Sequence, residues 1–347
     1  MKVLYRRSCK GFIALLMISF VIVAQEAPTG GPAEPSRRES DALDAFRGTL
    51  NGTIVWSSSR SNSRHDIWIM NADGTDKRQL TKTDNVDWFS RFSPDGKEVV
   101  FTRSNMGWVP ETEAEVYDKW DIWIIGVDGS NERKVAKSAS WASYYTQDTI
   151  LFARGPKVYF KSLSTEQETL IFDAEETFRR GSIAQQPQIS PDGRLLAMTM
   201  RGTTRETGIY NFSQKQWHTT GAGCQITFFP CGKRVLIMNE GQGRGGTQVL
   251  AYNLKDNGEP VERVSGLTIP RSVRFMDLPG RRSHEYFPKL DQTGEWMVWC
   301  AVQHGHDHDI YDYDMYIWNI NTDPEKDFVR LTFHTGNDRW PDLYTTK

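Results

Sequence analysis

A run of histidines and aspartates near the carboxyl end of the chain has the side chains that metal chemistry requires. It consists of Gln303-His304-Gly305-His306-Asp307-His308-Asp309. In an extended backbone alternate side chains share a side, so His304, His306 and His308 would face one way and the two aspartates the other. With His284 as a remote fourth ligand, the spacing suits a divalent metal such as zinc, manganese or calcium. The alternative is a solvated polar loop without a cofactor, in which His and Asp hydrogen-bond one another.

The elements that must position these residues recur along the chain. Two turns of the form Ser-Pro-Asp-Gly, at 93–96 and 190–193, each lead into an apolar strand. Proline presets the first turn position, aspartate bonds the turn backbone, and glycine accepts the left-handed conformation that ends it. Each such turn therefore joins two antiparallel strands, a and b, and the Asp-Gly turns at 73–74 and 128–129 join strands c and d.

The repeat predicts an all-β fold, a six-bladed β-propeller of four-stranded antiparallel blades spanning residues 49–347. Six strand-a sequences can be counted, but the last, near Trp340, has no strand b after it. The first repeat, beginning at Ile54, has strands b, c and d but no strand a. The two fragments complete one blade, so we expect the C-terminal strand to close the ring and remove exposed sheet edges.

This topology divides the loops between two faces. The a–b and c–d turns lie on a tight-turn face, and the b–c loops and d–a connections lie on a long-loop face. Function usually resides in long loops on a rigid frame, so we expect it on the long-loop face. Six of the seven histidines map there: His65, His284, His304, His306, His308 and His334.

Alignment of the strand-a sequences also places three carboxylates, Asp87, Glu285 and Asp338, at equivalent positions, with His284 beside Glu285. We expect them to ring the channel mouth on the long-loop face. Crowded carboxylates repel one another unless a cation or donor intervenes. The ring therefore predicts a bound cation, or a ligand with basic or hydroxyl groups. Alternatively, water or the arginines neutralise the ring: Arg271, Arg274 and Arg339.

The segments IWIMNADGTDKRQLT (67–81) and RFSPDGKEVVFT (91–102) resemble the TolB-type propeller repeat, and the resemblance extends over about residues 51–344. It implies a binding or scaffold module. TolB carries an amino-terminal α/β domain before its propeller, and we expect no counterpart here. The chain is also similar to oligogalacturonate lyases, TolB-like propellers that bind a metal through His and Gln. Gln303, His306 and His308 resemble that ligand set, which implies a metal-dependent carbohydrate-active enzyme, a polysaccharide lyase, as the alternative function.

The composition and the amino terminus define the setting. A formal charge of −2 does not favour binding to the phosphate backbone, so we expect no nucleic-acid partner. Residues 1–24 combine a basic start with a short apolar run, as in a signal peptide, and residues 25–48 are rich in Pro, Gly, Glu and Ser, as in a flexible linker. We expect a monomer in the periplasm or outside the cell, binding a protein or glycan of the envelope. Contact with the membrane would arise only through an uncleaved amino-terminal segment.

Export is the first testable prediction. We expect the mature protein to begin at or near Gln25, because Ala24 offers a small residue at the end of an apolar run that is too short to span a bilayer. Mass spectrometry of the envelope fraction should find this shortened chain without detergent. Recovery of the intact chain from Met1 in the membrane would contradict the prediction.

Overall fold

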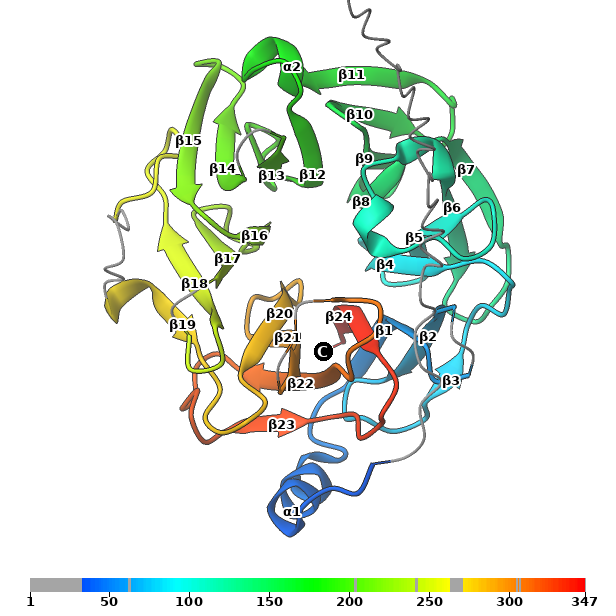
Figure 1. Cartoon of the computed structure of the whole chain (residues 1–347), viewed down its shortest axis with the longest axis vertical. Coiled ribbons are helices and arrows are strands. Elements are labelled where there is room, and N and C mark those ends of the chain that lie inside the picture. The colour runs from blue at the N-terminus through cyan, green and yellow to red at the C-terminus, as the bar shows by residue number, and fades with distance from the viewer. Residues whose placement is uncertain are drawn as a thin grey trace, which may run out of the picture.

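The computed structural model describes residues 33–61, 64–202, 205–240, 243–262, 271–303, 305 and 307–346. The expected signal peptide, residues 25–32 of the expected linker, His304 and His306 lie outside the described residues. Figure 1 shows six four-stranded blades arranged around a central axis, as the repeats predict. Each blade is antiparallel throughout, and the innermost strands of neighbouring blades contact one another around the ring.

Each blade is given from its innermost strand outward. The first three blades consist of β24 (Asp338–Thr345), β1 (Gly52–Ser58), β2 (Asp66–Asn71) and β3 (Arg78–Gln79); β4 (Asp87–Phe92), β5 (Glu98–Ser104), β6 (Trp120–Gly126) and β7 (Arg133–Lys137); and β8 (Ser140–Thr146), β9 (Thr149–Arg154), β10 (Lys157–Ser162) and β11 (Glu168–Asp173). The last three consist of β12 (Ile183–Ile189), β13 (Leu195–Arg201), β14 (Glu206–Asn211) and β15 (Gln216–Gly221); β16 (Cys224–Phe228), β17 (Arg234–Glu240), β18 (Thr247–Asn253) and β19 (Arg274–Met276); and β20 (His284–Leu290), β21 (Trp296–Val302), β22 (Asp314–Asn319) and β23 (Phe328–Arg330).

The C-terminal strand closes the ring as predicted. Strand β24 pairs with β1 from Gly52 opposite Thr345 to Ser58 opposite Asp338. In Figure 1 the last strand, in red, lies beside the first, in blue. The a–b turns also have the predicted form, since Gly96 and Gly193 adopt φ of 71° and 74° in the left-handed region that favours glycine.

The expected flexible linker is wrong for residues 37–46, which form the helix α1 (Arg37–Phe46). Ser36 and Glu39 form a capping box at its start, and this local signal is present in the sequence. Phe46 is buried against Trp296, with ring centroids 5.7 Å apart, and Glu39 pairs with Arg330 of β23 at 2.9 Å. The helix is therefore docked on the outer side of the sixth blade (Figure 1).

The remaining helical elements are single turns in the connections. They are η1 (Glu111–Glu113) and η2 (Tyr117–Lys119) in the β5–β6 loop, α2 (Ala174–Thr177) before β12, and η3 (Arg271–Val273) before β19. No helix in the described part of the chain is long and apolar enough to cross a membrane.

Candidate functional site

Every innermost strand carries a β-bulge that turns one side chain into the central channel. At each bulge a residue other than glycine takes a left-handed conformation, with φ between 53° and 63°. Such a conformation costs roughly 1–2 kcal/mol per residue, so the tertiary structure must enforce it. These channel residues, one from each blade, are Phe89, Trp141, Gln186, Gln225, Phe287 and Trp340.

The channel residues fill the middle of the ring. Trp340 packs against Phe287 with centroids 4.2 Å apart and against Phe89 at 5.0 Å. On the opposite side, Gln186 Oε1 accepts a hydrogen bond of 2.9 Å from the backbone N–H of Gln225, and Gln225 Oε1 accepts one from the N–H of Phe287. This layer separates two pockets, one on each face.

The pocket on the long-loop face has a volume of about 290 Å³, and we call it the long-loop pocket. Its floor includes the channel residues Trp141, Gln186 and Gln225, and its walls come from the b–c loops and the starts of inner strands. The remaining lining residues are Glu111, Thr112, Glu115, Gln185, Arg201, Arg205, Cys224, Asp307, His308 and Asp309.

Glu111, in the β5–β6 loop of the second blade, reaches across this mouth to the last strand of the chain. Its carboxylate accepts hydrogen bonds from Arg339 Nη1 at 2.8 Å and from Trp340 Nε1 at 2.9 Å, and lies 2.7 Å from His308 Nδ1. Arg339 is fully buried and also pairs with Asp309 at 2.7 Å. Glu111, with the partners His308, Arg339 and Trp340, therefore forms a buried latch across the channel mouth.

The two carboxyl groups at the latch, Glu111 and Asp309, have pKa values shifted in opposite directions. Burial alone would raise the pKa of Glu111, but His308 and the Arg339 guanidinium outweigh it and lower that pKa to about 2. Burial raises the pKa of Asp309 above its ordinary value despite Arg339. An ionised Glu111 accepts hydrogen bonds and is a poor proton donor near neutral pH, so the latch suits positioning better than acid catalysis.

Donors of the long-loop pocket remain without acceptors. Gln225 is 5% exposed, and its Nε2 has no hydrogen-bond partner in the described structure. The Nε atoms of Arg201 and Arg205 are likewise unpaired, although Arg205 pairs with Glu240 at 2.8 Å through Nη1. Buried donors are nearly always satisfied in folded proteins, so these atoms mark places where a bound group can accept hydrogen bonds.

The predicted ring of carboxylates at this mouth is wrong in detail. Asp87, Glu285 and Asp338 do lie at the beginning of inner strands β4, β20 and β24. However, all three are fully buried and none lines the long-loop pocket. Each is neutralised or satisfied within the fold, so the expected repulsion between them does not arise.

Their partners differ from those expected. Asp87 forms two hydrogen bonds with Arg103, at 2.7 and 2.8 Å. Asp338 accepts from Arg60 at 2.6 Å, and although burial opposes ionisation, Arg60 and Ser58 hold the pKa of Asp338 below its ordinary value. Burial raises the pKa of Glu285 well above its ordinary value, and its carboxyl accepts from the backbone N–H of Leu278 at 2.7 Å.

The expected metal ligands are only partly described. His284 begins β20 and does not line the long-loop pocket, whereas His308 does. Among the described residues no group of three or more His, Cys, Asp or Glu side chains is arranged to hold a metal ion. His304 and His306 lie outside those residues, so the metal site stays a prediction.

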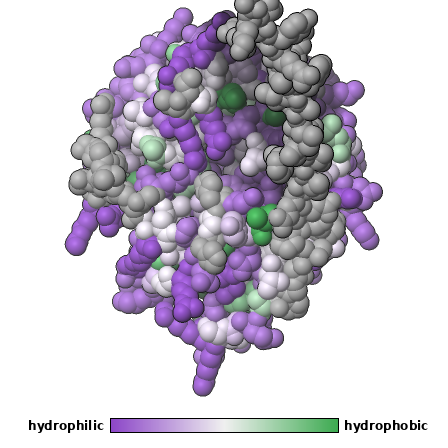
Figure 2. Space-filling model, in the orientation of Figure 1, coloured by the Kyte–Doolittle hydropathy of each residue, from purple (hydrophilic) through white to green (hydrophobic). Residues whose placement is uncertain are grey.

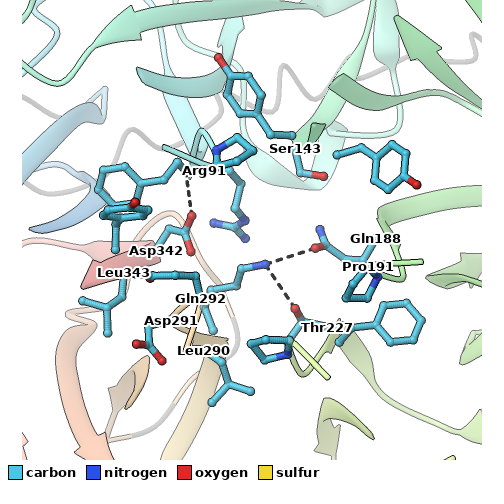
Figure 3. Close-up of a pocket in the computed structure, with 18 of the residues that line it drawn as sticks. Arg91, Ser143, Gln188, Pro191, Thr227, Leu290, Asp291, Gln292, Asp342 and Leu343 are labelled. Carbon is cyan, nitrogen blue, oxygen red and sulfur yellow. Dashed lines mark hydrogen bonds between the residues drawn. The ribbon is translucent and has the colours of Figure 1, made fainter. Parts of the chain in front are cut away.

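A second pocket, of about 370 Å³, opens on the tight-turn face, and we call it the tight-turn pocket. Sequence reasoning directed attention to the long-loop face and missed it. It lies among the a–b turns and is shown in Figure 3. A signal existed in the aligned strands, since the position two residues after each channel residue is polar in every blade, and all six side chains face this pocket. We call them the polar ring: Arg91, Ser143, Gln188, Thr227, Lys289 and Asp342.

Comparison with known proteins agrees with the architecture. No family model matches the chain, and no curated protein matches its sequence. Among solved structures, TolB from Acinetobacter baumannii superposes with a TM-score of 0.55 and 15% identity, over 88% of this chain and 69% of that chain. The chain has a TolB-like β-propeller fold.

Two further structures resemble this TolB-like propeller less closely. A protein assigned as TolB from Agrobacterium tumefaciens gives a TM-score of 0.49 at 13% identity, over 84% of this chain and 99% of that chain. An oligogalacturonate lyase in complex with manganese gives 0.45 at 9% identity, over 69% of each chain. The likeness to the Acinetobacter baumannii protein, at 15% identity, establishes the fold alone.

Proposed function

We propose that this TolB-like propeller is an exported binding module of the cell envelope, which takes up an extended segment of a partner protein at its long-loop pocket. The observation that carries the proposal is that the long-loop pocket has a fixed wall and hydrogen-bond donors without acceptors. The Glu111 latch fixes one wall, while the buried amide of Gln225 and the guanidinium groups of Arg201 and Arg205 retain donors without acceptors. The backbone carbonyls of an extended peptide are suitable acceptors.

The loop that carries Glu111 supports a protein partner. Five large apolar side chains are exposed in the described structure, and three of them, Met106, Val116 and Tyr117, belong to the β5–β6 loop; the other two are Leu170 and Val261. In the view of Figure 2 the exposed described residues are otherwise mostly hydrophilic. The same loop contributes Glu111, Thr112 and Glu115 to the lining of the pocket. A loop that offers both exposed apolar side chains and polar pocket residues resembles protein interfaces, in which apolar contacts exclude water around specific hydrogen bonds.

Peptide binding can be tested without knowing the partner. Wild-type protein is screened against a library of immobilised 12-residue peptides, and the best binders are then measured in solution by calorimetry. We expect Gln225→Glu to weaken binding at least tenfold, because the substitution keeps the oxygen that accepts from Phe287 and removes the unpaired donor. The matched control is Gln214→Glu, which adds the same charge at an exposed residue of the β14–β15 turn.

The same assay includes soluble oligomers of N-acetylglucosamine as glycan probes. Glycan binding without peptide binding would replace the protein ligand by a carbohydrate. Absence of both, or peptide affinity unchanged in Gln225→Glu, would contradict a binding role for the long-loop pocket.

A further inference from the structure

The tight-turn pocket contains two cations that have no ion-pair partner. Arg91 and Lys289 belong to the polar ring, on the second and sixth blades, which flank the first blade on either side. Lys289 Nζ donates to two neutral oxygens, Gln188 Oε1 at 3.2 Å and Thr227 Oγ1 at 3.3 Å, which are the dashed lines on the right of Figure 3. Within the described chain, neither cation has a carboxylate oxygen at ion-pair distance.

Arg91 is held in place by neutral groups. It is 7% exposed, its guanidinium lies 4.1 Å from the centre of the Phe89 ring, and its Nη1 donates to the carbonyl of Ser90 at 2.7 Å. Its Nε has no hydrogen-bond partner in the described structure. Figure 3 shows the guanidinium pointing into the middle of the pocket. The side chain is thus fixed with part of its donor capacity unused.

The two carboxylates of the pocket, Asp342 and Asp291, are engaged by other groups and pair with neither cation. Asp342 has one oxygen engaged by the backbone N–H of Phe92 at 2.8 Å. Asp291 accepts from the hydroxyls of Thr293 and Thr345, at 2.6 and 2.7 Å, and from backbone N–H groups of its own turn. Neither carboxylate lies at ion-pair distance from Arg91 or Lys289, and burying a charge without a partner is unfavourable, so the two cations leave a site for an anion.

The walls determine what the anion must be attached to. Around the polar ring the pocket is lined by aromatic, proline and leucine side chains: Phe92, Pro94, Tyr144, Tyr145, Pro191, Phe228, Phe229, Pro230, Leu290, Leu343 and Tyr344. A volume of about 370 Å³ suits a small organic molecule and exceeds what a bare ion needs. We propose that the tight-turn pocket binds a carboxylate carried on an apolar body, with the carboxylate between Arg91 and Lys289 and the apolar body against the walls.

The proposal concerns the face opposite the long-loop pocket and does not rest on the protein-binding function. The probe is N-acetylphenylalanine, compared by calorimetry with its neutral amide and with inorganic phosphate. We expect the acid to bind at least tenfold more tightly than the amide, which lacks the charge, and than phosphate, which lacks the apolar body. Equal binding of acid and amide would overturn the anion site, and equal binding of phosphate would overturn the assignment of a carboxylate.

Lys289→Met should reduce binding of the acid at least tenfold, because it removes the ammonium and keeps an unbranched side chain only one atom shorter. Lys97→Met is the matched control, since Lys97 is exposed in the turn before β5 and its loss removes the same charge. Binding that survives Lys289→Met would overturn the proposal. A melting temperature equal to or above that of the wild type would show that the variant is folded, because it removes an unpaired buried charge.

A measurement on the wild type needs no variant. Burial lowers the pKa of Lys289 to about 8, with Asp342 opposing and Arg91 reinforcing this effect, while Gln188 and Thr227 face the same ammonium without titrating. Anion affinity should therefore fall as the pH rises through about 8, where the ammonium loses its proton. Affinity of the acid that stays constant between pH 6.5 and 9.5 would remove Lys289 from the site.

Discussion

Deleting residues 337–347 should abolish the cooperative folding of this protein. The deletion removes β24, the innermost strand of the first blade, and leaves β1 as an unpaired edge facing the channel. It also removes Trp340 from the channel layer, where it contacts Phe287, Phe89 and Trp141 at 4.2, 5.0 and 5.4 Å between centroids.

The size of the effect follows from the packing. Replacing one buried tryptophan by alanine costs about 3–5 kcal/mol, and native domains have a total stability of about 5–15 kcal/mol. Losing Trp340, Leu343 and the strand pairing together should exceed that total. We expect no thermal transition by circular dichroism, and a Trp340→Ala variant should give a graded loss of about 3–5 kcal/mol.

A shorter deletion is the matched control. Removing only residues 346 and 347 leaves β24 complete and should change the free energy of unfolding by no more than about 0.5 kcal/mol. A truncation at 337 that melts cooperatively at the temperature of the full chain would refute closure of the ring by the C-terminal strand.

Removing the carboxylate of Glu111 should have the second-largest effect. Glu111→Ala leaves the buried Arg339 with Asp309 as its remaining carboxylate and leaves the indole N–H of Trp340 without its acceptor. Breaking a buried ion pair by removing one partner costs about 3–5 kcal/mol, because the other charge stays buried. Chemical denaturation at neutral pH should show a loss of this size.

Glu113→Ala is the control in the same short helix. Glu113 is partly exposed and pairs with Lys119, and a surface pair of this kind contributes about 0–1 kcal/mol. If the two substitutions lowered the free energy of unfolding equally, the ion pair and hydrogen bonds of Glu111 would contribute no more to stability than an exposed residue of the same loop.

The latch also predicts a pH dependence. The pKa of Glu111 falls from 4.5 to about 2 on folding, which corresponds to roughly 3 kcal/mol in favour of the folded state. Because the folded value is the lower one, this contribution is complete above about pH 4.5 and is lost as the pH falls toward 2. The difference in stability between wild type and Glu111→Gln should therefore be largest at neutral pH and should narrow below pH 4.5. A difference that stays constant down to pH 2 would contradict the ion pair.

Local chemistry in the sequence was enough to determine the propeller. The Ser-Pro-Asp-Gly turns, the alternating strands and the missing strand a of the first repeat specify six blades and their closure, because turn conformation and strand period act over a few residues. The same reasoning separated the two faces. The capping box of α1 is an equally local signal, but the polar composition of residues 25–48 led to the prediction of a linker instead. The helix is stabilised by docking on β23, which only the tertiary structure shows.

Only the tertiary structure decided which side chains meet in the channel. Glu111 and Arg339 are 228 residues apart, and no periodicity relates the β5–β6 loop to β24. The carboxylates of Asp87 and Asp338 aligned correctly in sequence, yet their charges are balanced by Arg103 on β5 and by Arg60 in the loop after β1. The six bulges turn Phe89 and its equivalents into the channel against the local preference of their backbone, because closing the ring forces that conformation on each inner strand.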